Sequence, residues 1–189
     1  MKVTFYTYLI FIAFLLNTSV LQAQKKISGI TVPQTLTVDK VPLTLNGAGI
    51  RTKYFMDMYV GALYLQKSNK EANRILAANE PMAIRLHIVS GLINSKKIEE
   101  ALNEGFEKST NGNTAIYKEK IEAFNAPFKE ELKQNDIFDI VYSNETITIL
   151  KNNQPKANIK GHDFKKVVFG IWLSDKPADE NLKKGMLGG

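Results

Sequence analysis

The segment that most restricts the fold of this chain is residues 45–65, LNGAGIRTKYFMDMYVGALYL. Gly47 and Gly49 allow backbone angles that other residues avoid, which is typical of a tight bend or a bulge in a strand. Arg51 follows directly, where such a bend would present its side chain. The alternative interpretation is a glycine-bulged strand that carries an arginine on the surface. If the chain has a functional site, we expect it in this segment.

Alternation continues after Arg51. From residue 54 to residue 64 every even position is apolar, whereas the odd positions are mixed. This period of two predicts a strand with one buried face. A helix is disfavoured by Gly61 and by the aromatic enrichment of the segment.

A distance limits how Arg51 and Tyr59 can act together. They are eight residues apart, so on an extended strand they would lie about 26 Å from each other. They can share a ligand only if the chain turns back between Thr52 and Met56. That interval holds no Gly, Asn or Pro, the residues that usually indicate a turn.

The rest of the chain reads as strands, then helices, then strands, then a helix. The expected strands are short ones within residues 27–45, interrupted at Pro33 and Pro42, and others at 82–90, 137–143, 146–150 and 156–160. The expected helices are 68–79 with Ser68 or Asn69 as its cap, 94–108 capped by Asn94 or Ser95, 114–124, a short one from 127, 163–173, and a last one that Gly185 ends. This order predicts an α+β fold, with a mostly antiparallel sheet and helices on one face.

Residues 1–23 have the layout of a secretory signal peptide. Lys2 precedes an apolar run over residues 5–16, and a segment with small residues ends at Ala23. The run is too short for an ordinary membrane span, so cleavage would leave one domain, residues 24–189, without a stable span. An uncleaved anchor is the alternative. We expect a secreted protein, located in the periplasm if the host is a Gram-negative bacterium.

Composition excludes several classes of function. The chain has no cysteine, so disulfides, thiolate catalysis and cysteine-bound zinc are excluded. His87 and His162 lack ligand-spaced neighbours, so no metal site is predicted, and we expect His87 on the solvent face of its strand. The net charge of +6 comes from dispersed lysines, which disfavours a nucleic-acid partner. No phosphate loop or dinucleotide motif is present, and no cofactor is expected.

The remaining chemistry is electrostatic. An arginine beside an apolar sheet face can hold a carboxylate or a phenolate. Tyrosine hydroxyls such as those of Tyr59 and Tyr64 can assist, and the apolar residues around them would accept the body of the ligand. We therefore predict a small apolar anion as the ligand, with Arg51, Tyr59 and Tyr64 as binding residues.

The motifs LNGAGIR and MYVGALYL, with FGIWLSDKP and DENLKKGML near the end, resemble the chalcone isomerase-like domain over roughly residues 42–187. The similarity is closest to the secreted bacterial branch of that family. It implies an open-faced β-sandwich with a helical layer and places Arg51 in the ligand cleft. In the isomerases that arginine assists an intramolecular ring closure without a cofactor. In the fatty-acid-binding branch an arginine and a tyrosine are associated with the bound carboxylate.

The chain departs from the enzyme pattern, because Tyr59 stands where the isomerases carry threonine and the segment before it is shorter. The enzymes' other polar active-site positions have no counterpart that the sequence identifies. Our first hypothesis is therefore a binder of small apolar anions, such as fatty acids or phenolic compounds, with little or no catalysis. The second is an isomerase or lyase for an enone-type substrate, with Arg51 as its catalytic residue. The third is an envelope structural or interaction protein with a vestigial cleft.

Overall fold

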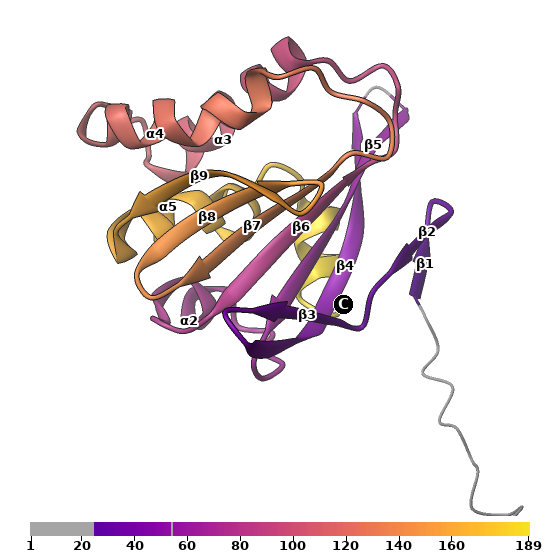
Figure 1. Cartoon of the computed structure of the whole chain (residues 1–189), viewed down its shortest axis with the longest axis horizontal. Coiled ribbons are helices and arrows are strands. Elements are labelled where there is room, and N and C mark those ends of the chain that lie inside the picture. Colours follow the sequence, from indigo (N-terminus) through magenta and orange to yellow (C-terminus); the bar gives the residue numbers. More distant parts are fainter. Residues whose placement is uncertain (1–24, 54) are drawn as a thin grey trace, which may run out of the picture.

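The computed structural model describes residues 25–53 and 55–189, so the expected signal peptide, residues 1–23, lies outside the described residues. A seven-stranded antiparallel sheet, in which β3 to β9 follow one another in chain order, forms the centre of the fold (Figure 1). Its strands are β3 (Thr35–Val38), β4 (Val41–Lys53), β5 (Met56–Leu65), β6 (Met82–Ile88), β7 (Ile137–Ser143), β8 (Thr146–Lys151) and β9 (Gln154–Lys160). A separate hairpin joins β1 (Lys25–Ile27) to β2 (Ile30–Val32). Each strand pairs with its neighbour in the sequence, which makes the sheet an antiparallel meander.

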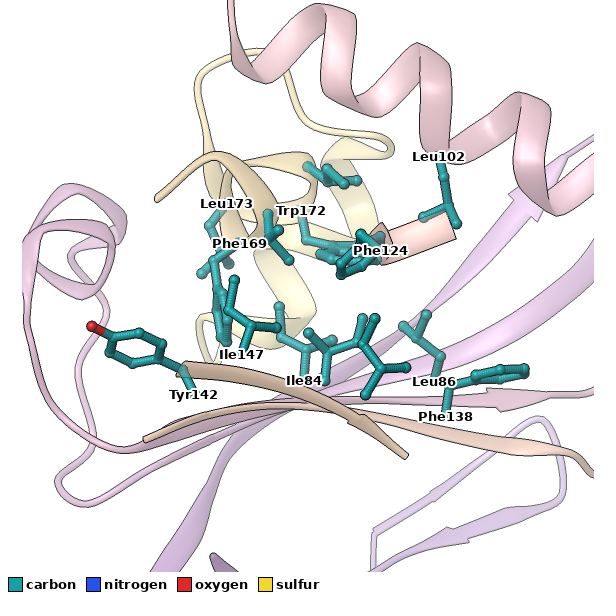
Figure 2. Packing of buried hydrophobic residues seen from close by; sticks show 14 of the residues in the cluster. Ile84, Leu86, Leu102, Phe124, Phe138, Tyr142, Ile147, Phe169, Trp172 and Leu173 are labelled. Carbon is teal, nitrogen blue, oxygen red and sulfur yellow. The ribbon is translucent and has the colours of Figure 1, made fainter. Parts of the chain in front are cut away.

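Helices cover one face of this sheet. They are α2 (Ala72–Ala77), α3 (Ser95–Ser109), the 3-10 turn η1 (Thr114–Tyr117), α4 (Lys118–Asn125), the 3-10 turn η2 (Ala126–Lys129), α5 (His162–Leu173) and α6 (Glu180–Met186). Figure 2 shows the core between the two layers, where Ile84 and Phe138 of the sheet pack beneath Phe124 and Trp172 of the helices. The predicted α+β architecture, an open-faced antiparallel sheet with a helical layer, is confirmed.

The prediction of one buried face on residues 54–64 is wrong, because β5 is buried on both faces. Tyr59, Leu63 and Leu65 belong to the core under the helices. Val60 and Tyr64 belong to a second cluster on the opposite face. Residues 30–33 close over that second face, a long-range contact that a periodic pattern cannot reveal.

The same cover explains His87, which we expected on a solvent face. Its side chain is half-buried, and its Nε2 atom is shielded from solvent. It lines a small hollow together with residues 30–33. Beside it, Arg85 and Asp139 form a two-pronged ion pair with distances of 2.7 and 2.8 Å.

Two predicted helix boundaries are wrong and one is confirmed. The helix expected from Ser68 begins only at Ala72, because the Ser68 hydroxyl and the Asn69 amide both donate to Oδ1 of Asn46 on β4, at 3.1 and 2.8 Å. Gly185 lies inside α6 rather than ending it. The Asn94 cap of α3 is confirmed, since its side chain accepts a hydrogen bond of 2.9 Å from the Lys97 amide.

Candidate functional site

A cavity of about 370 Å³ lies between the β4–β5 hairpin and the first half of α3. Its walls are formed by Arg51, Lys53, Met56, Met58 and Tyr59 of the hairpin and by Ile93, Lys97, Ile98, Glu100, Ala101 and Glu104 on or just before α3. The volume is within the range of roughly 300–1,000 Å³ that small-molecule sites occupy. The lining combines an apolar surface with a few charged groups, as such sites usually do.

The hairpin places Arg51 directly opposite Tyr59. β4 ends at Lys53 and β5 begins at Met56, and Arg51 pairs with Tyr59 in the antiparallel register. Directly opposite residues project on the same side of a sheet, so the two side chains lie together. The chain therefore turns back within the interval where no turn residue is present. Phe55 adopts a φ of 62°, a left-handed conformation that is uncommon outside glycine and that the sequence does not announce.

Arg51 is buried without a carboxylate partner. Its side chain is only 8% exposed, and Nη1 donates a hydrogen bond of 2.7 Å to the carbonyl oxygen of Ala178. Within residues 25–53 and 55–189, no ion pair joins Arg51 to an acidic side chain. A guanidinium has five N–H donors, so the contact with Ala178 leaves others for the Tyr59 hydroxyl and for an anion in the cavity.

Tyr59 offers a neutral hydroxyl beside this cation. The Nε1 atom of Trp172 on α5 donates to the Tyr59 oxygen at 3.0 Å. Burial raises the pKa of the phenol above its ordinary value of 10.0, although the charge of Arg51 and the Trp172 hydrogen bond both act in the opposite direction. The hydroxyl is therefore protonated at neutral pH. It can donate its proton to a ligand oxygen that also contacts Arg51.

Four further charged side chains line the cavity. Lys53 and Lys97 are basic, and Lys97 Nζ donates to the carbonyl of Leu92 at 3.0 Å. Of the two acids, Glu104 is paired with Lys108 at 2.6 Å, and that hydrogen bond lowers the pKa of its carboxyl group. The negative charge of Glu104 is thus balanced by Lys108. Among the described residues of the lining, Glu100 is then the one acid set against three cationic groups, those of Arg51, Lys53 and Lys97. The electrostatics of the cavity favour an anion.

Tyr64 lies outside this cavity. It belongs to the cluster on the opposite face of the sheet, and its hydroxyl donates to the carbonyl of Pro33 at 2.9 Å. Burial raises the pKa of Tyr64 to about 12. The structure thus brings Arg51 and Tyr59 together and separates Tyr64 from them, because even and odd positions of β5 point to opposite sides.

Gly47 and Gly49 let α6 approach the sheet closely. A Cβ on Gly47 would stand 2.7 Å from the carbonyl oxygen of Met186, and one on Gly49 would stand 3.2 Å from the Leu182 backbone. Neither glycine has a positive φ, and the register of the β4–β5 pair shifts just before Gly47 and again just after Arg51. The glycines therefore help to position Arg51 indirectly. They allow α6 to pack on the sheet, and the segment leading into α6 supplies the Ala178 carbonyl that accepts from Arg51.

Several site residues were not predicted. Ile98 and Ala101 are apolar residues of the helix expected at 94–108, and nothing in its sequence distinguishes the part that faces a cavity from the part that faces the core. Trp172 lies in the helix expected at 163–173, and the sequence does not indicate that its N–H reaches Tyr59. The Ala178 contact uses a backbone carbonyl, which leaves no mark in a sequence.

Metal-site geometry is lacking from the described part of the chain, where no three His, Asp or Glu side chains gather closely enough to hold an ion. Among the same residues, no helix has the length and apolar character needed to cross a membrane.

Comparisons with known proteins bear on the family and the fold of the chain. Residues 24–188 match the family model described as chalcone isomerase-like. A similar solved structure is that of a fatty-acid binding protein from Arabidopsis thaliana, with a TM-score of 0.68 and 18% sequence identity over 87% of this chain and 94% of that one. At that identity the likeness establishes a shared fold. No curated protein sequence matches the chain.

Proposed function

Because the chain belongs to the chalcone isomerase-like family, we propose that it binds a small carboxylic acid with an apolar body, such as a fatty acid, in the cavity lined by Arg51 and Tyr59. The observation that carries the proposal is the buried guanidinium of Arg51, which has no carboxylate partner among the described residues. A vestigial cleft would more naturally neutralise such a cation internally. The fold shared with a fatty-acid binding protein supports the same ligand class.

In this proposal, each part of the ligand has a counterpart in the cavity. The carboxylate accepts hydrogen bonds from the Arg51 guanidinium and from the neutral Tyr59 hydroxyl, which Trp172 orients from behind. The apolar body lies against the side chains of Met58 and Ile98. Each methylene that leaves water contributes about 0.8 kcal/mol, so the tail supplies affinity while Arg51 supplies the preference for an acid.

We also propose that the protein acts after secretion. The signal-like layout of residues 1–23 supports this, as does the start of the family match at residue 24, directly after the predicted cleavage site. Intact-mass analysis of the protein isolated from its host should give a chain that begins at Gln24. A mass that retains residues 1–23 would favour an uncleaved anchor.

Substitution of Arg51 by methionine should weaken binding of decanoic acid about 30-fold, since a hydrogen bond to a charged group contributes roughly 2 kcal/mol. Binding of decanol, which has the same tail and no charge, should change little. Isothermal titration of the delipidated protein measures both affinities. Arg74→Met is the matched control, because Arg74 is exposed on α2 and does not line the cavity.

Four results would count against this assignment. If the wild-type protein fails to bind decanoic acid, or if the Arg51→Met variant binds it with the same affinity as the wild type, Arg51 does not form a carboxylate site. Equal losses for the acid and the alcohol would mean that Arg51 only shapes the cavity. Turnover of a hydroxychalcone that is abolished in the Arg51→Met variant would instead support the isomerase hypothesis.

A further inference from the structure

Two large apolar side chains protrude into solvent next to residues that line the cavity. Phe55 is 105% exposed and lies between Lys53 and Met56, both of which line the cavity. Leu92 is 60% exposed and directly precedes Ile93, another lining residue. A fully exposed aromatic ring makes no contribution to the core, so the position of Phe55 calls for an explanation outside the packing of the fold.

The two protrusions come from separate parts of the chain that the sheet brings together. The amides of Val89 and Ser90 donate to the carbonyl of Met58 at 3.0 and 3.3 Å, which fixes the loop after β6 beside the β4–β5 hairpin. Leu92 follows in that loop, and its carbonyl accepts from Lys97. Figure 1 shows the tip of the hairpin and the start of α3 at the same end of the molecule.

Basic residues lie close to these two positions in the chain. Lys53 and Lys97 line the cavity, and Lys96 is exposed in the first turn of α3. Of the acids nearby, Glu104 is paired with Lys108, and Asp57 accepts hydrogen bonds from Ser28 and Thr52. Glu100 also lines the cavity and is outnumbered by the three lysines. Exposed aromatic and leucine side chains among lysines are the combination that binds the interface of an anionic bilayer, where the apolar groups enter the acyl boundary and the lysines meet the headgroups.

We propose that this rim, defined as Phe55, Leu92, Lys53, Lys96 and Lys97, docks on the surface of an anionic lipid bilayer. Phe55 and Leu92 insert, and the mouth of the cavity is held against the membrane. The docking stands on the exposed rim alone. Docking would allow an apolar acid to pass between the bilayer and the cavity, and this role rests on the proposed function.

The absence of cysteine from the chain allows the rim to be observed directly. An environment-sensitive NBD label is attached to the full chain through Phe55→Cys, Leu92→Cys or Ile116→Cys. Ile116 is the matched control, because it is 67% exposed but lies in η1, beyond the far end of α3. Vesicles of phosphatidylglycerol mixed with phosphatidylcholine should shift the emission to the blue at positions 55 and 92 and leave position 116 unchanged. The same response at all three positions, or none at any, overturns the proposal. A chain held on the vesicle only through residues 1–23 would not distinguish positions 55 and 92 from position 116, and so would also overturn it.

Vesicle sedimentation then tests the energetics. The double variant Phe55→Ser/Leu92→Ser should bind these vesicles at least about tenfold more weakly, given the apolar area it removes, whereas Ile116→Ser should bind as the wild type does. Lys96→Gln should weaken binding about fivefold on the anionic vesicles and have no effect on pure phosphatidylcholine. Unchanged binding of the double variant contradicts the proposal.

The two proposals fail separately. Arg51→Met should bind decanoic acid more weakly and bind vesicles as the wild type does. The double variant should bind vesicles more weakly and keep its affinity for decanoic acid in solution. A double variant that loses both, with unchanged circular dichroism, would show that Phe55 and Leu92 belong to the cavity rather than to a membrane surface.

Discussion

Replacement of Gly47 by alanine is expected to lower the free energy of unfolding by about 3 kcal/mol and the melting temperature by about 10 °C. The added Cβ would stand 2.7 Å from both the carbonyl oxygen of Met186 and the amide nitrogen of Gly188, and closer still to the carbonyl oxygen of Gly185. All three are backbone atoms, so a rotamer change cannot relieve the overlap. Either α6 or β4 must move.

Urea unfolding monitored by circular dichroism measures this loss. Gly91→Ala is the matched control, because a Cβ at Gly91 would meet no atom within 4 Å and its φ is not positive. That variant should unfold within about 0.5 kcal/mol of the wild type. If Gly47→Ala were equally stable, the close packing of α6 on β4 would be refuted.

The same variant should affect the site. α6 begins two residues after Ala178, whose carbonyl holds the Arg51 guanidinium, and the buried Leu182 and Met186 of α6 fix the helix in the core. Displacement of α6 therefore releases one of the contacts that position Arg51. Hydrogen exchange should show greater loss of protection in residues 180–186 than in β7 and β8, since α6 meets the substituted strand directly.

Truncation of Lys165 to alanine is expected to cost about 4 kcal/mol of stability, because it leaves a cavity and also removes a hydrogen-bond donor from buried carbonyls. The Lys165 side chain is fully buried on α5. Its ammonium donates to the carbonyl oxygens of Ile75, Leu76 and Ala78 at 2.7, 3.0 and 2.8 Å, and so satisfies the C-terminal end of α2. The rings of Tyr142 and Phe169 lie 5.5 and 5.6 Å from the nitrogen.

Lys166→Ala provides the comparison for this experiment. Lys166 is the next residue on α5 and is exposed, so its truncation should change the free energy of unfolding by less than about 0.5 kcal/mol. Equal stability of the two variants would mean that α2 does not need the donor that Lys165 provides.

The stability difference between the wild type and Lys165→Ala should also depend on pH. Burial lowers the pKa of the Lys165 ammonium from its ordinary value of 10.5 to about 8. Between these two pH values the unfolded chain binds the proton that the folded chain has released, so the stabilising contribution of Lys165 rises with pH. We expect the difference to widen by about 2 kcal/mol from pH 8 to pH 10.5, as measured by urea unfolding at intervals. A difference that narrows over this range would show that the buried charge is favourable.

Local patterns were sufficient to predict most of the fold. Met82, Ile84, Leu86 and Ile88 alternate along the strand predicted at 82–90, and all four are buried. The strands predicted at 137–143 and 146–150 leave Asn144 and Glu145 between them, and both adopt the positive φ of a tight hairpin turn. These elements depend on neighbours in the chain, which a sequence displays directly.

The site was harder to predict because its parts meet only through tertiary contacts. Arg51 and Tyr59 were proposed as binding residues, but their meeting required a turn in a segment without Gly, Asn or Pro. The left-handed Phe55 makes that turn, and local propensity argues against it. Tyr64 was grouped with Tyr59 on composition, although the two positions differ by an odd number and so face opposite sides of the sheet.

The dependence of Arg51 on the Ala178 carbonyl has a consequence for synthesis of the chain. Every strand of the sheet precedes residue 161 and pairs with a neighbour already made, so the meander can assemble in the order in which the ribosome produces it. The contact that anchors Arg51 spans 127 positions and becomes available only when residue 178 has emerged. The contact that positions Arg51 is therefore made only after the strands of the sheet have been synthesised.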